Sequence, residues 1–342
     1  MNMYNWIEQM IYTERKKALP VLTFPSVQYM YITTRELVAD SNHQAIGMRA
    51  MFDNYDMPAV FGYMDLSVEA EAFGAYTVYT ADEVPTIIGK LISTQEEADA
   101  LVVPELGAGR TGITVEGIKK AQKLIHDKPI FAQCIGPFSL AGRLMNVNDI
   151  MLQCYEEPEL VHTVLRKATD FIIKYALEFK KEGANGIMIA EPLAGLLSPT
   201  LIDEFSTQYV KEIVDAIQDR QFITFYHNCG NSVPHIIDSI IDTGCSAFHF
   251  GESAEMSEML NKIPRNCLVL GNISPARVFN DKTPEQTRIE TLKLLKACAE
   301  YNNFIISSGC DLPPNVDLDN VQMFFDTVNR FYYQRSLRNA IA

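Results

Sequence analysis

Eight short apolar runs recur along the chain, and helical segments separate them. The runs are rich in Val, Ile and Phe and cover residues 21–27, 59–65, 129–136, 186–192, 222–229, 246–252, 267–272 and 304–310. Between them, segments such as 158–184 and 199–220 repeat apolar residues at the three- and four-residue spacing of an amphipathic helix. Strands that are apolar throughout are buried on both faces, as in a parallel sheet covered by helices. Eight strand–helix units therefore predict an α/β fold of the (β/α)8 TIM-barrel type.

Two parts of the chain lie outside this regular alternation. Residues 66–128 separate the second and third runs, which is too long for one helical crossover, so we expect an insertion with its own structure after the second strand. Residues 1–20 precede the first run and are predicted to form an N-terminal helical extension. No Ser/Gly linker or low-complexity tract divides the sequence, so a single barrel domain over residues 1–342 is expected.

Composition and charge exclude several classes of partner. The formal net charge is −14 and no stripe of Lys and Arg is present, which argues against binding to nucleic acid. No apolar run approaches the roughly 18 residues of a membrane helix, and the first residues lack the pattern of a secretory signal. Seven cysteines, an odd number scattered through the chain, favour a reducing compartment. We therefore expect a cytoplasmic protein without a membrane partner.

Polar residues interrupt the apolar runs at their carboxyl ends. In a barrel these ends meet at one mouth, where the catalytic residues of such folds lie. The polar and loop-forming residues at the ends are Asp65, the segment Pro137-Phe138-Ser139, Glu191, His227, Cys229, Glu252, Asn272 and Cys310. Core packing alone would not select polar residues at the same end of so many strands. The mouth is therefore the candidate functional site.

A histidine and two cysteines among these residues indicate a metal site. His227 and Cys229 are two apart on one strand, so both side chains point to the same face. Cys310 ends the last strand, just before a Pro-Pro pair that stops regular structure. One imidazole and two thiolates suit tetrahedral zinc, and three protein ligands leave a fourth position open, as in catalytic sites. Glu252 is the candidate for a displaceable fourth ligand, and Glu191 is its competitor.

The motifs "YHNCGN", "GCDLPP", "CIGPFSLAGRLM", "MDLSVEAEAFG", "IAEPLAGLLSP" and "LVLGNISPARVFNDKTPEQT" together resemble the uroporphyrinogen decarboxylase superfamily. Within it they resemble the cobalamin-dependent methyltransferase branch, over about residues 20 to 335. The resemblance implies a (β/α)8 barrel with one catalytic zinc bound by His227, Cys229 and Cys310. The more distant cobalamin-independent methionine synthase has a similar ligand arrangement with a later Glu, which favours Glu252 as the fourth ligand.

The activity that the resemblance implies is a zinc-dependent transfer of a methyl group between a corrinoid and a thiol. The corrinoid would be methylcobalamin or the group of a separate corrinoid protein, because nothing in the chain resembles a corrinoid-carrying domain. The thiol would be one such as coenzyme M or homocysteine, and the direction of transfer stays open. Residues at the rim are predicted to contact the corrinoid, and these are Pro137, Phe138, Ser139 and Asn231.

The identity of the thiol depends on the charges at the mouth. A sulfonate, as in coenzyme M, requires a cation, for which Arg143 is the candidate. The ammonium of homocysteine instead requires carboxylates, for which Asp65 and Glu191 are the candidates. Both carboxylates are therefore predicted to be catalytic residues.

Two functions of other classes remain as alternatives. The first is a metal-free, uroporphyrinogen-decarboxylase-like tetrapyrrole decarboxylase. Those enzymes carry an arginine-rich segment after the first strand, whereas residues 26–40 contain only Arg35; Asp65 does lie where the decarboxylases place an important aspartate. The second alternative is a non-catalytic module that binds zinc or a corrinoid protein.

Overall fold

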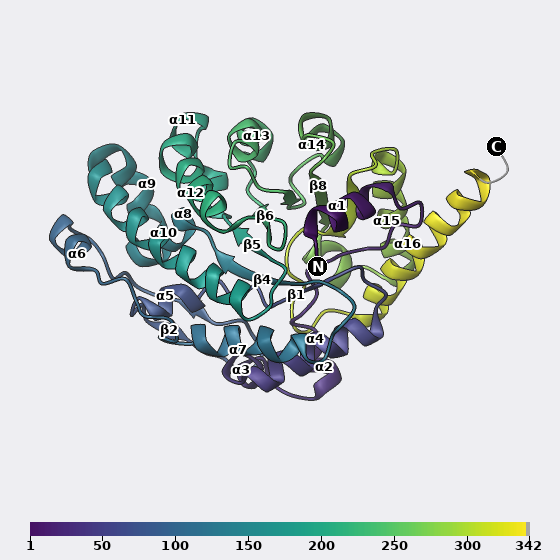
Figure 1. The fold of residues 1–342 in the computed structure, drawn as a ribbon, viewed down its shortest axis with the longest axis horizontal. Helices are drawn as coiled ribbons and strands as arrows, with labels where there is room; N and C mark the ends of the chain where they lie inside the picture. The colour runs from purple at the N-terminus through teal and green to yellow at the C-terminus, as the bar shows by residue number, and fades with distance from the viewer. Residues whose placement is uncertain (340–342) are drawn as a thin grey trace.

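The computed structural model of the chain describes residues 1–339, in which helices surround a curled parallel sheet (Figure 1). The strands of this sheet are β1 (Val60–Phe61), β4 (Ile130–Ile135), β5 (Gly186–Ala190), β6 (Ile223–Asn228), β7 (Ala247–Phe250), β8 (Leu268–Ile273) and β9 (Phe304–Ser308). Within the described residues these seven strands form one sheet in the order β1-β4-β5-β6-β7-β8-β9, and all neighbouring pairs are parallel. The predicted α/β fold of the TIM-barrel type is confirmed.

The helices cover the outer face of the sheet, and most follow a strand in the chain. Their bounds are α1 Met3–Tyr12, α2 Ser26–Met30, α3 Thr34–Ala39, α4 Ser41–Asn54, α5 Val68–Ala72, α6 Gln95–Ala100, α7 Thr111–Gln122, α8 Pro137–Met145, α9 Val147–Glu156, α10 Pro158–Lys181, α11 Pro199–Ile202, α12 Gln208–Ile217, α13 Val233–Ile241, α14 Met256–Lys262, α15 Pro284–Cys298 and α16 Leu318–Asn339. A short 3-10 turn, η1 (Leu193–Leu196), and two π-helical turns, η2 (Asp203–Thr207) and η3 (Pro275–Asn280), lie in the loops.

The first of the eight predicted runs is not a strand of the sheet, so that part of the prediction is wrong. Its residues still close the barrel between the two edge strands. The amide of Val21 donates to the Ser308 hydroxyl of β9 at 3.0 Å, and the hydroxyl of Thr23 donates to a β1 carbonyl at 3.0 Å. Pro25 has no N–H for a ladder, and α2 begins directly after it. Individual hydrogen bonds therefore replace a regular ladder at this position.

The long interval between the second and third runs contains structure of its own. Besides α5, α6 and α7, it holds an antiparallel pair of short strands, β2 (Thr77–Val78) and β3 (Thr86–Ile87). Helix α7 packs along α4 and against β4, so it belongs to the outer layer of the barrel. The chain between β2 and β3 lies at the carboxyl end of the barrel, where it borders the mouth.

The strand side chains alternate between two hydrophobic clusters. On β6, Ile223 and Phe225 belong to the cluster inside the barrel, whereas Tyr226 and the preceding Phe222 belong to the outer cluster beneath the helices. This two-residue period continues to His227 and Cys229, which have the parity of Phe225. The sequence pattern therefore places both candidate ligands on the inner face of the barrel.

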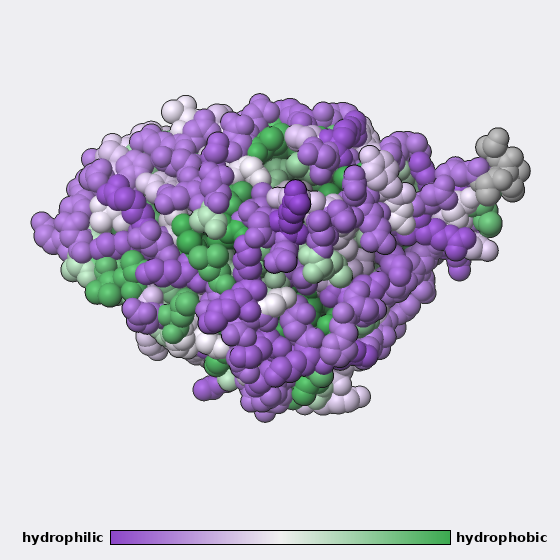
Figure 2. Space-filling model, viewed as in Figure 1, coloured by the Kyte–Doolittle hydropathy of each residue, from purple (hydrophilic) through white to green (hydrophobic). Residues whose placement is uncertain are grey.

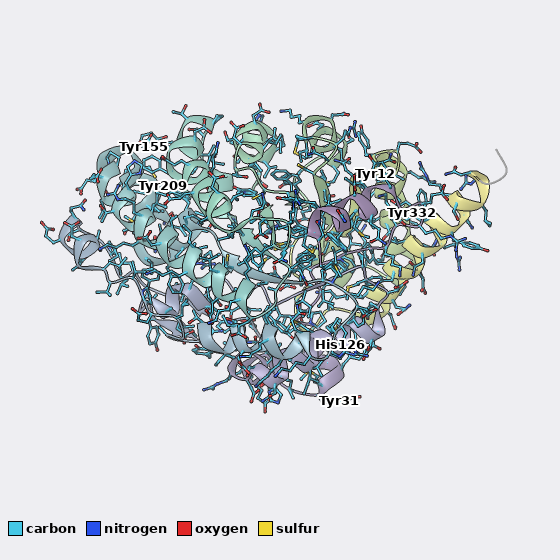
Figure 3. All side chains as sticks on the ribbon, in the orientation of Figure 1. Tyr12, Tyr31, His126, Tyr155, Tyr209 and Tyr332 are labelled. Carbon is cyan, nitrogen blue, oxygen red and sulfur yellow. The ribbon has the colours of Figure 1, made fainter. Side chains whose placement is uncertain are left out.

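Helix α1 closes the end of the barrel opposite the mouth. The amide of its first residue donates to the carbonyl of Arg220, just before β6 begins. Its buried residues enter the inner cluster, and the Trp6 ring lies 5.3 Å from the ring of Phe131, centroid to centroid. Tyr12 at its other end is exposed (Figure 3). The face that carries α1 is mostly hydrophilic (Figure 2). Nowhere in residues 1–339 does a helix have the length and apolar character to cross a membrane.

Candidate metal centre at the barrel mouth

Three predicted ligands come together at the carboxyl ends of the strands. The ligand atoms of His227, Cys229 and Cys310 all lie within 4.8 Å of one another, and we call these three residues the His–Cys–Cys cluster. His227 is the last residue but one of β6, Cys229 directly follows this strand, and Cys310 lies just after β9. The Cys310 sulfur is 3.6 Å from Nε2 of His227, so this ring nitrogen faces the thiols.

A second histidine orients the first. His249 is the register partner of His227 on β7, and their Nδ1 atoms are 2.7 Å apart. Nε2 of His249 lies 3.0 Å from the hydroxyl of Ser307 on β9. Burial and the neighbouring His227 lower the pKa of His249, so its ring is neutral. A proton on Nδ1 of His227 would then be donated to His249, leaving Nε2 of His227 with a free lone pair toward the cysteines.

The two thiols of the cluster differ in their acidity. A hydrogen bond from Cys310 lowers the pKa of Cys229, and the nearby His227 lowers it further. Conversely, the interaction with Cys229 and burial raise the pKa of Cys310. The pair thus favours one thiolate and one thiol in the absence of a cation. A thiolate, a second sulfur and a correctly oriented imidazole are a donor set that fits zinc.

Two glycines allow the loops to approach the cluster closely. A Cβ on Gly251 would overlap the Cβ of Cys229, and a Cβ on Gly309 would lie 3.0 Å from the backbone nitrogen of Glu252. The backbone around Glu252 therefore packs directly against both cysteine-bearing segments.

The carboxylate of Glu252 nevertheless points away from the cluster. Its Oε2 accepts hydrogen bonds from Arg277, at 3.0 Å from Nη2 and 3.2 Å from Nε. Arg277 belongs to η3, which follows β8. The predicted role of Glu252 as a fourth ligand thus stays a prediction.

Glu191 holds together the residues predicted to contact the corrinoid. This fully buried carboxylate accepts from the Phe138 amide at 2.8 Å, and from the amide and hydroxyl of Ser139 at 2.9 and 2.7 Å. It therefore caps the start of α8, whose first residue is Pro137. Burial raises the pKa of Glu191 to about 7, although these hydrogen bonds oppose the shift. Because residues 137–139 are buried here, their contact with a corrinoid stays a prediction.

The other two predicted residues lie at different depths. Asn231 is exposed in the loop after β6, two residues beyond Cys229, so it lies at the rim. Asp65 is buried and ion-paired with Arg110 from the loop before α7. Arg110 also donates to Glu71 at 2.6 Å and to the Tyr79 hydroxyl at 2.9 Å. Sequence reasoning missed Arg110, although an arginine in the glycine-rich stretch "GAGRTG" was a possible signal.

A cavity of about 560 Å³ opens beside the cluster. Asp311, which directly follows Cys310, forms part of its wall together with Met64, Leu66 and the chain between β2 and β3. Both carboxyl oxygens of Asp311 are buried without a hydrogen-bond partner among residues 1–339, and burial raises the pKa of this group. Arg143 is half-buried in the same wall, and within the described chain it makes no ion pair. The cavity wall thus carries a cation and a buried carboxyl group.

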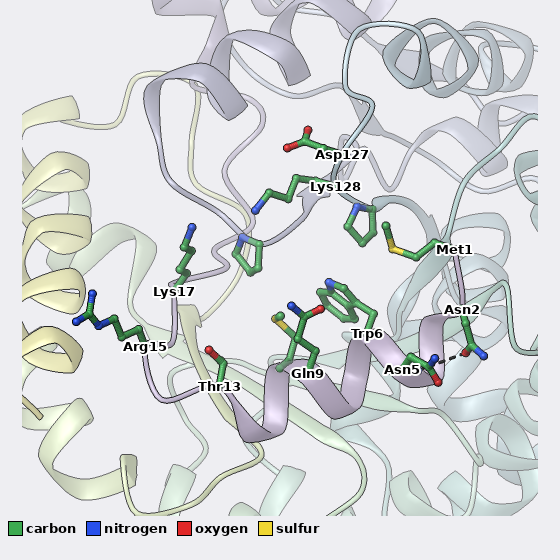
Figure 4. A pocket seen from close by; sticks show the side chains of 13 residues that line it. Met1, Asn2, Asn5, Trp6, Gln9, Thr13, Arg15, Lys17, Asp127 and Lys128 are labelled. Atoms are coloured by element: carbon green, nitrogen blue, oxygen red, sulfur yellow. Dashed lines mark hydrogen bonds between the residues drawn. The ribbon is translucent and has the colours of Figure 1, made fainter. Parts of the chain in front are cut away.

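Another depression, of about 500 Å³, lies beside α1 (Figure 4). Trp6 and Gln9 of α1 line it from one side, with Lys17 and Lys128 across from them. It borders the residues that precede β1 and β4, so it lies at the closed end of the barrel, opposite the His–Cys–Cys cluster. The mouth cavity, which adjoins the cluster, is therefore the candidate site.

Comparison with known proteins agrees with this architecture. The family described as uroporphyrinogen decarboxylase (URO-D) matches residues 26–331 of the chain. The chain belongs to this family. Among solved structures, this URO-D family chain is similar to a methyltransferase from Methanosarcina mazei, with a TM-score of 0.85 and 22% identity over 95% of this chain and 97% of that one.

Curated relatives of this URO-D family member include two kinds of enzyme. The methylcobamide:CoM methyltransferase MtbA of Methanosarcina acetivorans is 26% identical over 302 residues, covering 86% of this chain and 84% of the relative. A uroporphyrinogen decarboxylase of Chlorobium phaeobacteroides is 25% identical over 309 residues, with the same two shares of 86% and 84%. Because both activities occur on this fold, the residues at the mouth must distinguish them.

Proposed function

We propose that this URO-D family member is a zinc-dependent methyltransferase that moves a methyl group between a corrinoid and a thiol. The observation that carries the proposal is the His–Cys–Cys cluster at the barrel mouth. A decarboxylase that works without metal does not require two thiols and an imidazole placed so that they can bind one ion. A similar relative is a methylcobamide:CoM methyltransferase, which supports the same reaction class.

The residues of the cluster have the properties that such a reaction requires. A zinc ion held by His227, Cys229 and Cys310 would lower the pKa of a substrate thiol and so provide a nucleophilic thiolate at neutral pH. His249 keeps the lone pair of His227 directed at the cysteines. The lowered pKa of Cys229 makes a thiolate available for binding the ion.

The charges in the cavity favour a thiol with an anionic end, such as coenzyme M. Arg143 supplies a cation in the cavity wall. The carboxylates predicted to bind the ammonium of homocysteine are already engaged: Asp65 by Arg110, and Glu191 by three donors of α8. A sulfonate at Arg143 would leave the thiol end free to reach the cluster. We propose that a separate corrinoid protein supplies the corrinoid at the open mouth.

One observation bears on the alternative of a tetrapyrrole decarboxylase. Asp65, which lies where decarboxylases place an important aspartate, is buried at the mouth. Its carboxylate is paired with Arg110, however, and Arg35 after the first run is exposed and stands alone in that segment. The carboxylates of a porphyrin would therefore lack the arginines that the decarboxylases provide. The decarboxylase is the less favoured function.

The test combines metal analysis with an assay of methylcobalamin demethylation. Wild-type protein should hold one zinc per chain and demethylate methylcobalamin with coenzyme M, faster than with homocysteine. Cys229→Ser should lose both properties, because it removes a thiolate ligand. The matched control is Cys267→Ser, a cysteine at the closed end of the barrel. Folded wild-type protein that binds no zinc, or transfers no methyl group to or from any thiol, would refute the proposal.

A further inference from the structure

Glu252 combines a backbone fixed at the cluster with a side chain directed elsewhere. Its neighbour Gly251 packs on Cys229, and its own nitrogen lies against Gly309, which precedes Cys310. The Glu252 side chain therefore leaves the backbone at a point that lies close to both cysteine-bearing segments. A glutamate has three rotatable side-chain bonds, so rotation about these bonds can redirect its carboxylate without moving the backbone.

Arg277 is the group that holds the carboxylate in its outward position. Both hydrogen bonds converge on the same oxygen of Glu252, at 3.0 and 3.2 Å. They lie in a cleft of about 290 Å³ that also contains Lys282 and Lys293. Lys282 is already paired with Glu290 at 2.9 Å. Arg277 is thus the cation assigned to Glu252.

The ion pair is exposed and therefore weak. The side chains of Arg277 and Glu252 are 71% and 42% exposed, so water and salt compete with the pair. A pair of this kind shifts an equilibrium by about fivefold at most. It can bias the position of a carboxylate, but it cannot lock that position against a metal ion nearby.

We propose that Arg277 acts as a latch on the fourth ligand position of the metal centre. The Glu252 carboxylate exchanges between the Arg277 guanidinium and the fourth position beside the His–Cys–Cys cluster. When the carboxylate is held by Arg277, the fourth position is open to a substrate thiol. When it is released, it closes that position and retains the ion between turnovers. The inference rests on the proposed zinc site and adds a positioning residue to it.

Zinc affinity of the unloaded protein measures the latch without any turnover. Arg277→Gln removes the competitor for the carboxylate, so zinc should bind about two- to fivefold more tightly in competition with a chromogenic chelator. The same change should raise the KM of the thiol, because the carboxylate then occupies the fourth position for more of the time. Raising salt from about 0.1 M to about 1 M should reduce the difference in zinc affinity between wild type and Arg277→Gln, because salt screens the ion pair between Arg277 and Glu252.

A double-mutant cycle separates the latch from a general effect of charge. Removing any cation near zinc favours the ion, so Lys282→Gln, in the same cleft, serves as the charge control. The latch requires that Arg277→Gln tighten zinc binding in the wild-type background but not in the Glu252→Gln background. It also requires that Arg277→Gln tighten zinc binding more than Lys282→Gln does. Equal tightening with and without Glu252, or no tightening, would overturn the latch while leaving the zinc site intact. Wild-type protein without zinc would instead refute the proposed function, and the latch with it.

Discussion

The contact between His227 and His249 allows a prediction about metal affinity. His249 is fully buried, and it bonds to His227 at 2.7 Å and to Ser307 at 3.0 Å. We expect His249→Phe, which keeps a flat ring of similar size, to weaken zinc binding. Without an acceptor at Nδ1, the proton of His227 is no longer held away from Nε2, the atom that faces the cysteines.

The expected magnitude follows from the role of an outer-shell partner. Loss of such a partner typically weakens metal affinity about 10- to 100-fold, or about 1.4 to 2.8 kcal/mol. Independently, a buried ring N–H without an acceptor costs about 1–3 kcal/mol of folding stability. Phe cannot accept the hydrogen bond, whereas the side-chain oxygen of Gln can. His249→Gln should therefore recover part of the affinity that His249→Phe loses.

The assay is competition for zinc with a chelator of known affinity, together with the thermal unfolding midpoint of each variant. Ser307→Ala is the matched control, because it removes the outer hydrogen bond and leaves the contact between the two histidines. It should weaken zinc binding less than His249→Phe. If folded His249→Phe binds zinc as tightly as wild type, the proposed orienting role of His249 is wrong.

Three further predictions concern the cluster, the cavity and a buried acid. Cys310→Ser should lower the zinc content below one per chain, as measured by elemental analysis, because serine is a poor ligand for zinc at neutral pH. Arg143→Met should raise the KM of coenzyme M more than that of neutral 2-mercaptoethanol; an equal change for both thiols would contradict the role of Arg143. Burial raises the pKa of Glu69 to about 8 from the usual value of 4.5. Between these two pH values the folded protein keeps a proton on Glu69, whereas the unfolded chain has released it. The unfolding free energy should therefore fall as pH rises from 4.5 to about 8, and urea titrations should show a flatter profile for Glu69→Gln.

The sequence alone predicted the barrel type of the fold and three residues whose side chains the structure brings together at the mouth. Alternating apolar runs and amphipathic segments predict a barrel because a parallel sheet buried on both faces must be built from such runs. The placement of His227 and Cys229 on one face follows from the two-residue period of a strand, which is a local property of the backbone. Cys310 could be assigned because the carboxyl ends of all strands in this fold meet at one mouth.

Only the tertiary structure decided which polar side chains face the cluster. Glu191 and Glu252 have the same chemistry and similar positions after a strand, yet one caps α8 and the other pairs with Arg277, 25 residues further along the chain. The ion pair between Asp65 and Arg110 and the contact between His227 and His249 likewise join segments that are distant in sequence. A local pattern fixes the direction in which a side chain leaves the backbone, whereas its final position depends on the partners that packing brings within reach.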